Sequence, residues 1–230
     1  MSKLALIRHG QAKSFQRENA LTPLGETQAA RLACYWLRHG VEFDEVVTGT
    51  LARQVRTEQV VADAFRDAGR QWPEARRDPG WNEYDAMGVL GHHDDRLTAL
   101  KQEYEAARGR PDENRYFQRL LEAAMLLWMD GDLASQHIEP WAAFRERVTA
   151  AVERVMAGPA SRRVAVFTSG GAIGFIVHVA TKAPARTFLD VNWRVRNLSV
   201  SEFLFDRDRL TLDSFNCIGH LEDKELWSYR

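Results

Sequence analysis

The stretch Leu4-Ala5-Leu6-Ile7-Arg8-His9-Gly10 decides the fold. Its first four residues form a short apolar run, which is typical of a buried β-strand, and the run ends on an Arg-His pair and a glycine. Open α/β sheets bind their ligands at the carboxyl ends of the strands. Because arginine neutralises an oxyanion and histidine attacks an electrophile or carries a proton, this strand end predicts a reactive imidazole at the binding edge of a sheet.

The composition is that of an ordinary globular protein. The chain has 230 residues, 45% of them hydrophobic and 27% charged, and its net charge of −1 gives no basic field for nucleic acid or an anionic membrane. No apolar run approaches the length of about 18 residues that a membrane-spanning helix needs. The two cysteines, Cys34 and Cys217, have no metal-type spacing, and we expect buried free thiols in a reducing cytoplasm.

Strand and helix patterns alternate along the chain. The run at 163–168 is nearly all apolar, so we expect it to be a central, parallel strand. This alternation predicts a three-layer α/β/α sandwich with a mostly parallel central sheet. The other expected strands cover residues 3–8, 45–48, 199–205 and 210–215, and the expected helices cover 26–39, 51–68 and 170–179.

The alternation breaks between residues 81 and 158, where the pattern is helical and no convincing strand occurs. We expect helices at about 94–107, 114–129 and 140–157. The prediction is a single domain over residues 1–230 with a helical insertion at about 92–158. The insertion either forms a lid or wall over the site or serves only stability, and the sequence favours neither reading.

Three expected strand ends lead into polar loops that contain glycine, after Ile7, Thr48 and Thr168. The second loop places Arg53 at a helix start, and the third, Thr168-Ser169-Gly170-Gly171, begins another helix. Free N–H groups at helix N-termini attract anions. Two arginines, a histidine and two helix starts at one edge predict an oxyanion site, since no zinc or calcium ligand spacing is present.

These motifs resemble a known family. The segments 6–11, 21–25 and 51–57 are similar to motifs of the histidine phosphatase superfamily, which has the phosphoglycerate mutase-like fold. Further similarity runs through residues 164–171, 197–199, 215–216 and 220–221. Glu83 falls where that superfamily places an acidic residue. Together these segments extend the resemblance over most of the chain except the insertion.

The resemblance implies a phosphatase that needs no metal or cofactor and works through a phosphohistidine intermediate. His9 would attack phosphorus, Arg8 and Arg53 would hold the phosphoryl oxygens, and Glu83 would act as acid and base. A small phosphorylated molecule would be the substrate, in the cytoplasm. The residues expected to contact it are Gln11, Thr22, Ser169 and Gly170.

One position departs from the family pattern. A second histidine is expected after the late central strand, where this chain has Ser169. Serine donates a hydrogen bond but brings no positive charge, and charge-assisted bonds are about twice as strong as neutral ones. Two alternatives therefore stay open, a weak or inactive phosphate-binding protein and a phosphoglycerate-type mutase. The loop 13–19 disfavours the mutase, because it lacks the Trp-Asn and Gly-Trp pattern of those enzymes.

Other polar residues have simpler interpretations. Thr57 is expected to brace the helix that carries Arg53, and Arg56 is either a third phosphate ligand or a solvated charge. The run His92-His93-Asp94-Asp95 suits helix capping better than metal binding. His178 and His220 are interpreted as structural, whereas His137 is a weaker candidate for reaching the site. The sequence leaves the particular substrate and the oligomeric state open.

Overall fold

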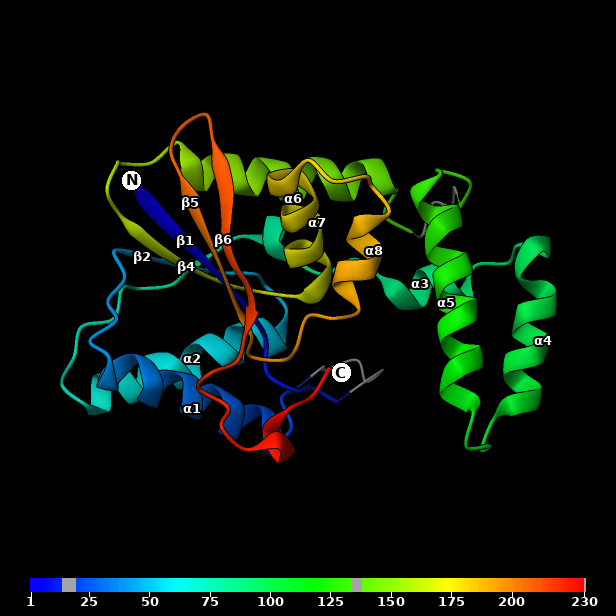
Figure 1. The fold of residues 1–230 in the computed structure, drawn as a ribbon, viewed down its shortest axis with the longest axis horizontal. Helices are drawn as coiled ribbons and strands as arrows, with labels where there is room; N and C mark the ends of the chain where they lie inside the picture. The colour runs from blue at the N-terminus through cyan, green and yellow to red at the C-terminus, as the bar shows by residue number, and fades with distance from the viewer. Residues whose placement is uncertain (14–19, 134–137, 230) are drawn as a thin grey trace. The chain divides into compact units, whose positions relative to one another are not determined.

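A six-stranded sheet with the order β3-β2-β4-β1-β5-β6 forms the centre of the protein (Figure 1). The structure is a computed structural model, and residues 1–13, 20–133 and 138–229 are described. The strands are β1 (Ser2–Arg8), β2 (Glu45–Thr48), β3 (Arg76–Arg77), β4 (Arg163–Thr168), β5 (Val200–Phe205) and β6 (Leu210–Cys217).

Four neighbouring strands run parallel, β3, β2, β4 and β1, and β5 and β6 add an antiparallel edge. The register pairs Arg8 with Thr168, so β1 and β4 end at the same level. His9 is the residue after β1 and Ser169 is the residue after β4, so the two lie side by side at the carboxyl edge of the sheet. The predicted central position and parallel direction of 163–168 are confirmed, with the same bounds.

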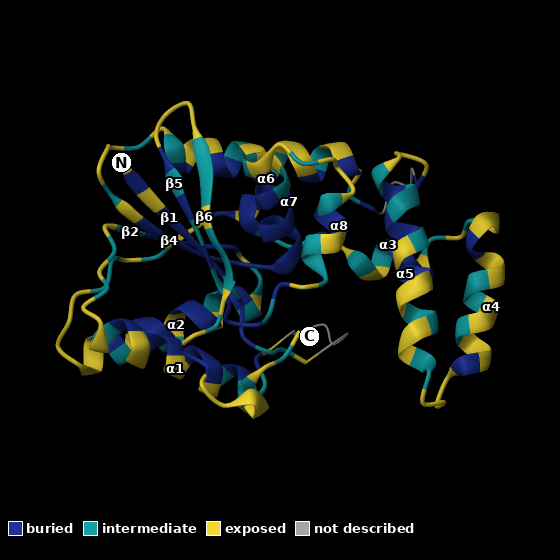
Figure 2. Cartoon of the chain, viewed as in Figure 1, coloured by how far each residue is buried: buried dark blue, intermediate teal, exposed yellow. Residues whose placement is uncertain are grey.

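Helices cover both faces of the sheet, which confirms the predicted three-layer α/β/α fold. In Figure 1, α1 (Pro23–Arg38) and α2 (Ala52–Asp67) lie below the strands, and α7 (Gly170–Thr181) lies to their right, on the other side of the sheet. The last turns of α6 (Trp141–Met156) lie on the same side as α7. Figure 2 shows the inner strands and α7 in the colour of buried residues. Between the sheet and α1 and α2, a core cluster includes Ile7, Trp36, Phe65 and Phe167, all at most 5% exposed.

The chain divides into two compact units. The first comprises Met1–Glu83 and Arg147–Arg230, and the second comprises Tyr84–Glu146. The second unit contains α3 (Ala86–Gly91), α4 (Thr98–Ala107), α5 (Glu113–Met129) and the start of α6. It has its own aromatic core, in which Tyr84, Trp128, Trp141 and Phe144 pack on one another. The helical character predicted for this region is confirmed, whereas the single-domain organisation stays a prediction.

One strand and one α-helix of the first unit were not predicted. β3 has two residues, and both are exposed arginines, so it carries no apolar pattern. α8 (Thr187–Asn192) has six residues, too few for a helical period to stand out.

The expected burial of the thiols is wrong. Cys34 and Cys217 are free but exposed. Cys34 points outward from α1, and Cys217 ends the edge strand β6. In the described part of the chain, none of the helices is long and apolar enough to span a membrane.

Candidate active site

Two glycines let the loop after β1 pack against the start of α1. A Cβ atom at Gly25 would lie 2.1 Å from the Gln11 carbonyl oxygen, and one at Gly10 would lie 2.7 Å from the Gly25 carbonyl oxygen. Thr22 caps α1 by accepting a hydrogen bond from the Gly25 N–H at 3.1 Å. The motif at 21–25 therefore shapes the loop that presents His9.

The imidazole of His9 is held at both nitrogens. Its Nδ1 lies 2.7 Å from the Gly10 carbonyl oxygen, which can only accept, so Nδ1 carries the proton and donates. The other nitrogen, Nε2, accepts a hydrogen bond from Arg53 Nε at 3.0 Å. The backbone is fixed as well, since the His9 N–H donates to Thr168 O at 2.9 Å and Asn197 Nδ2 donates to His9 O at 3.0 Å.

The surroundings keep His9 unprotonated. Burial, followed by the charges of Arg53 and Arg8, holds the pKa of His9 well below its usual value of 6.5, against a smaller opposite effect of the Gly10 carbonyl. His9 is 7% exposed. A neutral imidazole with Nδ1 protonated has its nucleophilic lone pair on Nε2, the atom that faces Arg53.

Arg53 is placed by the first turn of α2. Thr57, one turn later, donates from Oγ1 to Arg53 O at 2.7 Å and accepts from the Gly10 N–H at 3.0 Å. This is the bracing role predicted for Thr57. Burial lowers the pKa of the Arg53 guanidinium, and the negative charge of Glu83 acts in the opposite direction.

Arg8 lies beside the start of α7. Its Nη1 donates to the Val195 carbonyl, and a Cβ atom at Gly170 would lie 3.6 Å from Arg8 Nε. The same Cβ atom would lie 2.8 Å from Oδ1 of Asn192, the last residue of α8. Sequence reasoning missed Asn192, because α8 itself gave no signal.

Glu83 also meets the start of α7. Both of its carboxylate oxygens lie 3.1 Å from the Gly171 backbone nitrogen, which donates to them. The segment that carries Glu83 is held by Arg147, whose Nη1 donates to Gly80 O at 3.1 Å and to Asn82 O at 2.8 Å. A carboxylate is favourable at this helix terminus, where unpaired N–H groups point outward.

Ser169 contacts a residue that sequence reasoning did not single out. Its Oγ lies 2.9 Å from Gln54 Nε2, and both residues are fully buried. The only signal for Gln54 in the sequence is its place directly after Arg53.

Gln11 and Thr22 bond to one another. Thr22 Oγ1 donates to Gln11 Oε1 at 2.7 Å, and the Gln11 N–H donates to Gln28 Oε1 at 2.9 Å. Both residues therefore take part in loop hydrogen bonds, and their contact with substrate stays a prediction.

Several secondary candidates have structural partners. Arg56 forms a two-pronged ion pair with Glu26 at 2.8 Å, so it is a surface charge that links α2 to α1. Asp94 caps a short 3-10 helix by accepting from the Arg96 N–H, as predicted for the His-Asp run. His137 and residues 14–19 lie outside the described residues.

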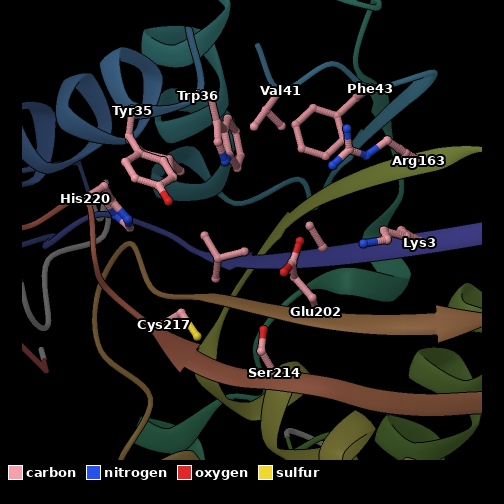
Figure 3. A pocket seen from close by; sticks show the side chains of 13 residues that line it. Lys3, Tyr35, Trp36, Val41, Phe43, Arg163, Glu202, Ser214, Cys217 and His220 are labelled. Atoms are coloured by element: carbon pink, nitrogen blue, oxygen red, sulfur yellow. The ribbon is translucent and has the colours of Figure 1, made fainter. Parts of the chain in front are cut away.

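A cavity of about 220 Å³ lies between α1 and the sheet (Figure 3). None of the predicted site residues lines it. His220, at one end, is buried and bonds the Leu198 backbone, and burial lowers the pKa of His220 to about 4. This supports the structural interpretation of His220.

The fold and the site together define an α/β protein with a neutral histidine and two arginines at the carboxyl edge of its sheet. A model of the histidine phosphatase superfamily (branch 1) matches residues 4–218, and the chain belongs to that superfamily, whose enzyme class is phosphatase. The resemblance seen in the sequence is thereby confirmed.

Solved structures share the fold. A phosphoglycerate mutase from Bacillus anthracis superposes with a TM-score of 0.66 at 15% identity, covering 96% of this chain and 95% of that chain. A putative alpha-ribazole-5'-P phosphatase from Escherichia coli gives 0.65 at 21% identity, with 94% and 97% covered. A mutant phosphoserine phosphatase from Entamoeba histolytica in complex with phosphoserine gives 0.64 at 18% identity, with 96% and 100% covered. No curated protein matches the chain.

Proposed function

We propose that the protein hydrolyses phosphomonoesters without a metal, through a phosphohistidine on His9. The observation that carries the proposal is the state of the His9 imidazole. It is buried, its Nδ1 proton is held by Gly10, and its Nε2 lone pair faces the Arg53 guanidinium. A nucleophile of this kind beside cationic donors suits attack on a phosphate group.

In the first step, Nε2 of His9 forms a bond to phosphorus while the bond from phosphorus to the ester oxygen breaks. Glu83, in its protonated form, gives its proton to the departing oxygen, which leaves as an alcohol. Splitting the reaction in this way replaces one difficult displacement by two easier ones.

In the second step, water attacks phosphorus and the N–P bond breaks. Glu83, now a carboxylate, takes a proton from that water, and inorganic phosphate leaves. His9 returns to its neutral form and Glu83 to its acid form, so protons balance over the cycle. The contact with the Gly171 N–H supports this second step, since it favours the carboxylate form of Glu83 at the start of α7.

The phosphoryl oxygens are held by Arg8, Arg53 and the start of α7, with Ser169 and Gly170 beside them. Arg53 donates to His9 Nε2, and we propose that it donates to a phosphoryl oxygen when substrate is bound. Such preorganised donors stabilise charge that develops in the transition state. Gln11 and Thr22 would contact the substrate from the loop before α1.

The substrate is proposed to be a small phosphorylated molecule. The solved structures named above include a putative alpha-ribazole-5'-P phosphatase and a phosphoserine phosphatase in complex with phosphoserine, and these support the class of substrate without selecting one compound. We place the protein in the cytoplasm, because the exposed free thiols Cys34 and Cys217 suit a reducing compartment.

Hydrolysis of 4-nitrophenyl phosphate in the presence of EDTA tests the proposal. The wild type should be active and unaffected by the chelator, and His9→Ala should lose activity. His39→Ala replaces an exposed histidine on the same chain and should keep activity, which makes it a matched control. A wild type that binds phosphate but does not hydrolyse the ester would support the alternative of an inactive phosphate-binding protein.

A further inference from the structure

The side-chain amide of Gln54 makes three hydrogen bonds, two of them buried. Its Oε1 lies 3.2 Å from Leu51 N, and its Nε2 lies 3.0 Å from Trp81 O and 2.9 Å from Ser169 Oγ. Gln54 is 0% exposed. Gly49 leaves room for this arrangement, since a Cβ atom there would lie 2.0 Å from Gln54 Oε1.

The backbone partners determine which way the amide points. A backbone N–H can only donate and a carbonyl oxygen can only accept. Oε1 must therefore face Leu51, and the NH₂ group must face Trp81 and Ser169. Flipping the amide would set two donors against each other at Leu51 and two acceptors against each other at Trp81, so the observed orientation is the chemically consistent one.

The orientation of the amide determines what Ser169 can do. Because Gln54 donates to Ser169 Oγ, the serine oxygen is an acceptor in this bond and its own hydrogen is left to donate elsewhere. Among the described residues, the Ser169 hydroxyl makes only the Gln54 bond, and it does not cap α7. A buried hydroxyl hydrogen without an acceptor is unfavourable, so this one suits an acceptor that arrives with a ligand.

Ser169 lies beside His9 at the carboxyl edge of the sheet. It follows β4 as His9 follows β1, and the His9 N–H donates to the carbonyl of the preceding Thr168 at 2.9 Å. The first turn of α2 contacts both positions with consecutive residues, Arg53 with His9 and Gln54 with Ser169.

We propose that Gln54 is a positioning residue that fixes Ser169 as an uncharged hydrogen-bond donor to a phosphoryl oxygen. The inference rests on the proposed function, because it assigns a donor within the same phosphate site. The donor takes the position where the family resemblance leads us to expect a second histidine. Unlike a histidine, it keeps the same charge across the working pH range.

The substitution Gln54→Glu tests this assignment with little change in shape. An ionised carboxylate cannot donate to Ser169, so it accepts the Ser169 hydrogen and removes that donor from the phosphoryl oxygen. We expect kcat to fall about 10- to 100-fold where the new carboxyl group is ionised, in the range typical of losing a hydrogen bond to a charged group. Relative to wild type, kcat should recover as the pH is lowered and the new carboxyl group becomes protonated. Gln59→Glu, on the exposed side of α2, adds the same charge and should leave kcat unchanged.

The Ser169→Ala background separates hydrogen bonding from charge. Ser169→Ala alone should lower kcat by a similar factor, and adding Gln54→Glu to it should bring no further pH-dependent loss. If the double variant shows the same pH dependence as Gln54→Glu, the effect is that of charge alone and the inference is overturned. A Gln54→Glu variant with wild-type kcat across the whole pH range overturns it too.

Hydrolysis and orthovanadate binding, measured on the same variants, distinguish a failure of this inference from a failure of the proposed function. If the wild type hydrolyses phosphate esters but Ser169→Ala is equally fast, the positioning inference fails and the function stands. If the wild type has no activity, the proposed function fails, and orthovanadate affinity then decides the inference. The inference stands if Gln54→Glu binds orthovanadate at least about 10-fold more weakly than wild type, and if the same substitution makes no difference in the Ser169→Ala background. The inference fails if Gln54→Glu binds orthovanadate as tightly as wild type.

Discussion

Arg53 donates from Nε to Nε2 of His9 at 3.0 Å, joining the first turn of α2 to the residue that follows β1. The contact has two consequences. It holds the imidazole so that Nε2 faces the start of α2, and together with burial and Arg8 it keeps the pKa of His9 well below 6.5.

Replacing Arg53 should therefore change both rate and pH dependence. We expect Arg53→Gln to lower kcat/KM by about 10²- to 10³-fold, the usual cost of removing a transition-state donor. The pKa of His9 should rise once the positive charge is gone, so the acid limb of the kcat/KM profile moves to higher pH. Arg56→Gln, which removes an exposed arginine from the same helix, is the control. An acid limb that stays in place for Arg53→Gln would show that Arg53 does not set the His9 pKa.

Replacing Glu83 should lower the rate of hydrolysis most for esters with poor leaving groups. A general acid matters when the departing oxygen is basic, so Glu83→Gln should lose about 10²- to 10⁴-fold in kcat on an alkyl phosphate. The loss on 4-nitrophenyl phosphate should be smaller, because nitrophenolate leaves without a proton. Glu74→Gln removes an exposed carboxylate and should affect neither substrate. Equal losses on both substrates would contradict the acid role.

The Gly25 backbone should tolerate no side chain. A Cβ atom there would lie 2.1 Å from Gln11 O, so Gly25→Ala must displace the loop that carries His9. We expect a loss of about 1–3 kcal/mol in the free energy of unfolding, as for other overpacked sites, together with a loss of activity. Urea denaturation measures the first effect. Gly91→Ala is the matched control, because no atom lies within 4 Å of its added Cβ, and its stability should be retained.

His220 should make the protein less stable in acid. Burial lowers its pKa from 6.5 to about 4, so between these values the unfolded chain binds more protons than the folded one. The contribution of His220 to the free energy of unfolding is therefore fully present above pH 6.5. It is lost as the pH falls toward 4, by roughly 3 kcal/mol in all. Urea denaturation across this range should show a shallower pH dependence for His220→Gln than for wild type, with His39→Gln as the exposed control. An identical slope in His220→Gln would contradict the prediction.

Most of the sheet could be predicted from the sequence, because its inner strands are apolar runs with abrupt ends. The bounds of β2 and β4 agree with the prediction, and the strand ends place His9 and Ser169 at one edge. β3 could not be found, since its two residues are arginines and only its pairing with β2 makes it a strand.

The contacts within the site were less accessible to sequence reasoning. Residues such as Arg53 can be identified as candidates from their residue type and from their place at a helix start. Gln54 does not, because its importance comes from the direction of one amide between Leu51, Trp81 and Ser169. The exposure of Cys34 could not be predicted from the sequence either, because its neighbours Ala33 and Trp36 are buried while Cys34 faces outward.

In the proposed reaction the phosphoryl group passes through His9, and rapid acid-free quenching with a radiolabelled phosphomonoester can detect it there. During turnover, the wild type should carry an acid-labile, alkali-stable label that peptide mapping places on His9, and His9→Ala should carry none. Turnover by the wild type with no label on His9, or with the label on another residue, would rule out a phosphohistidine on His9.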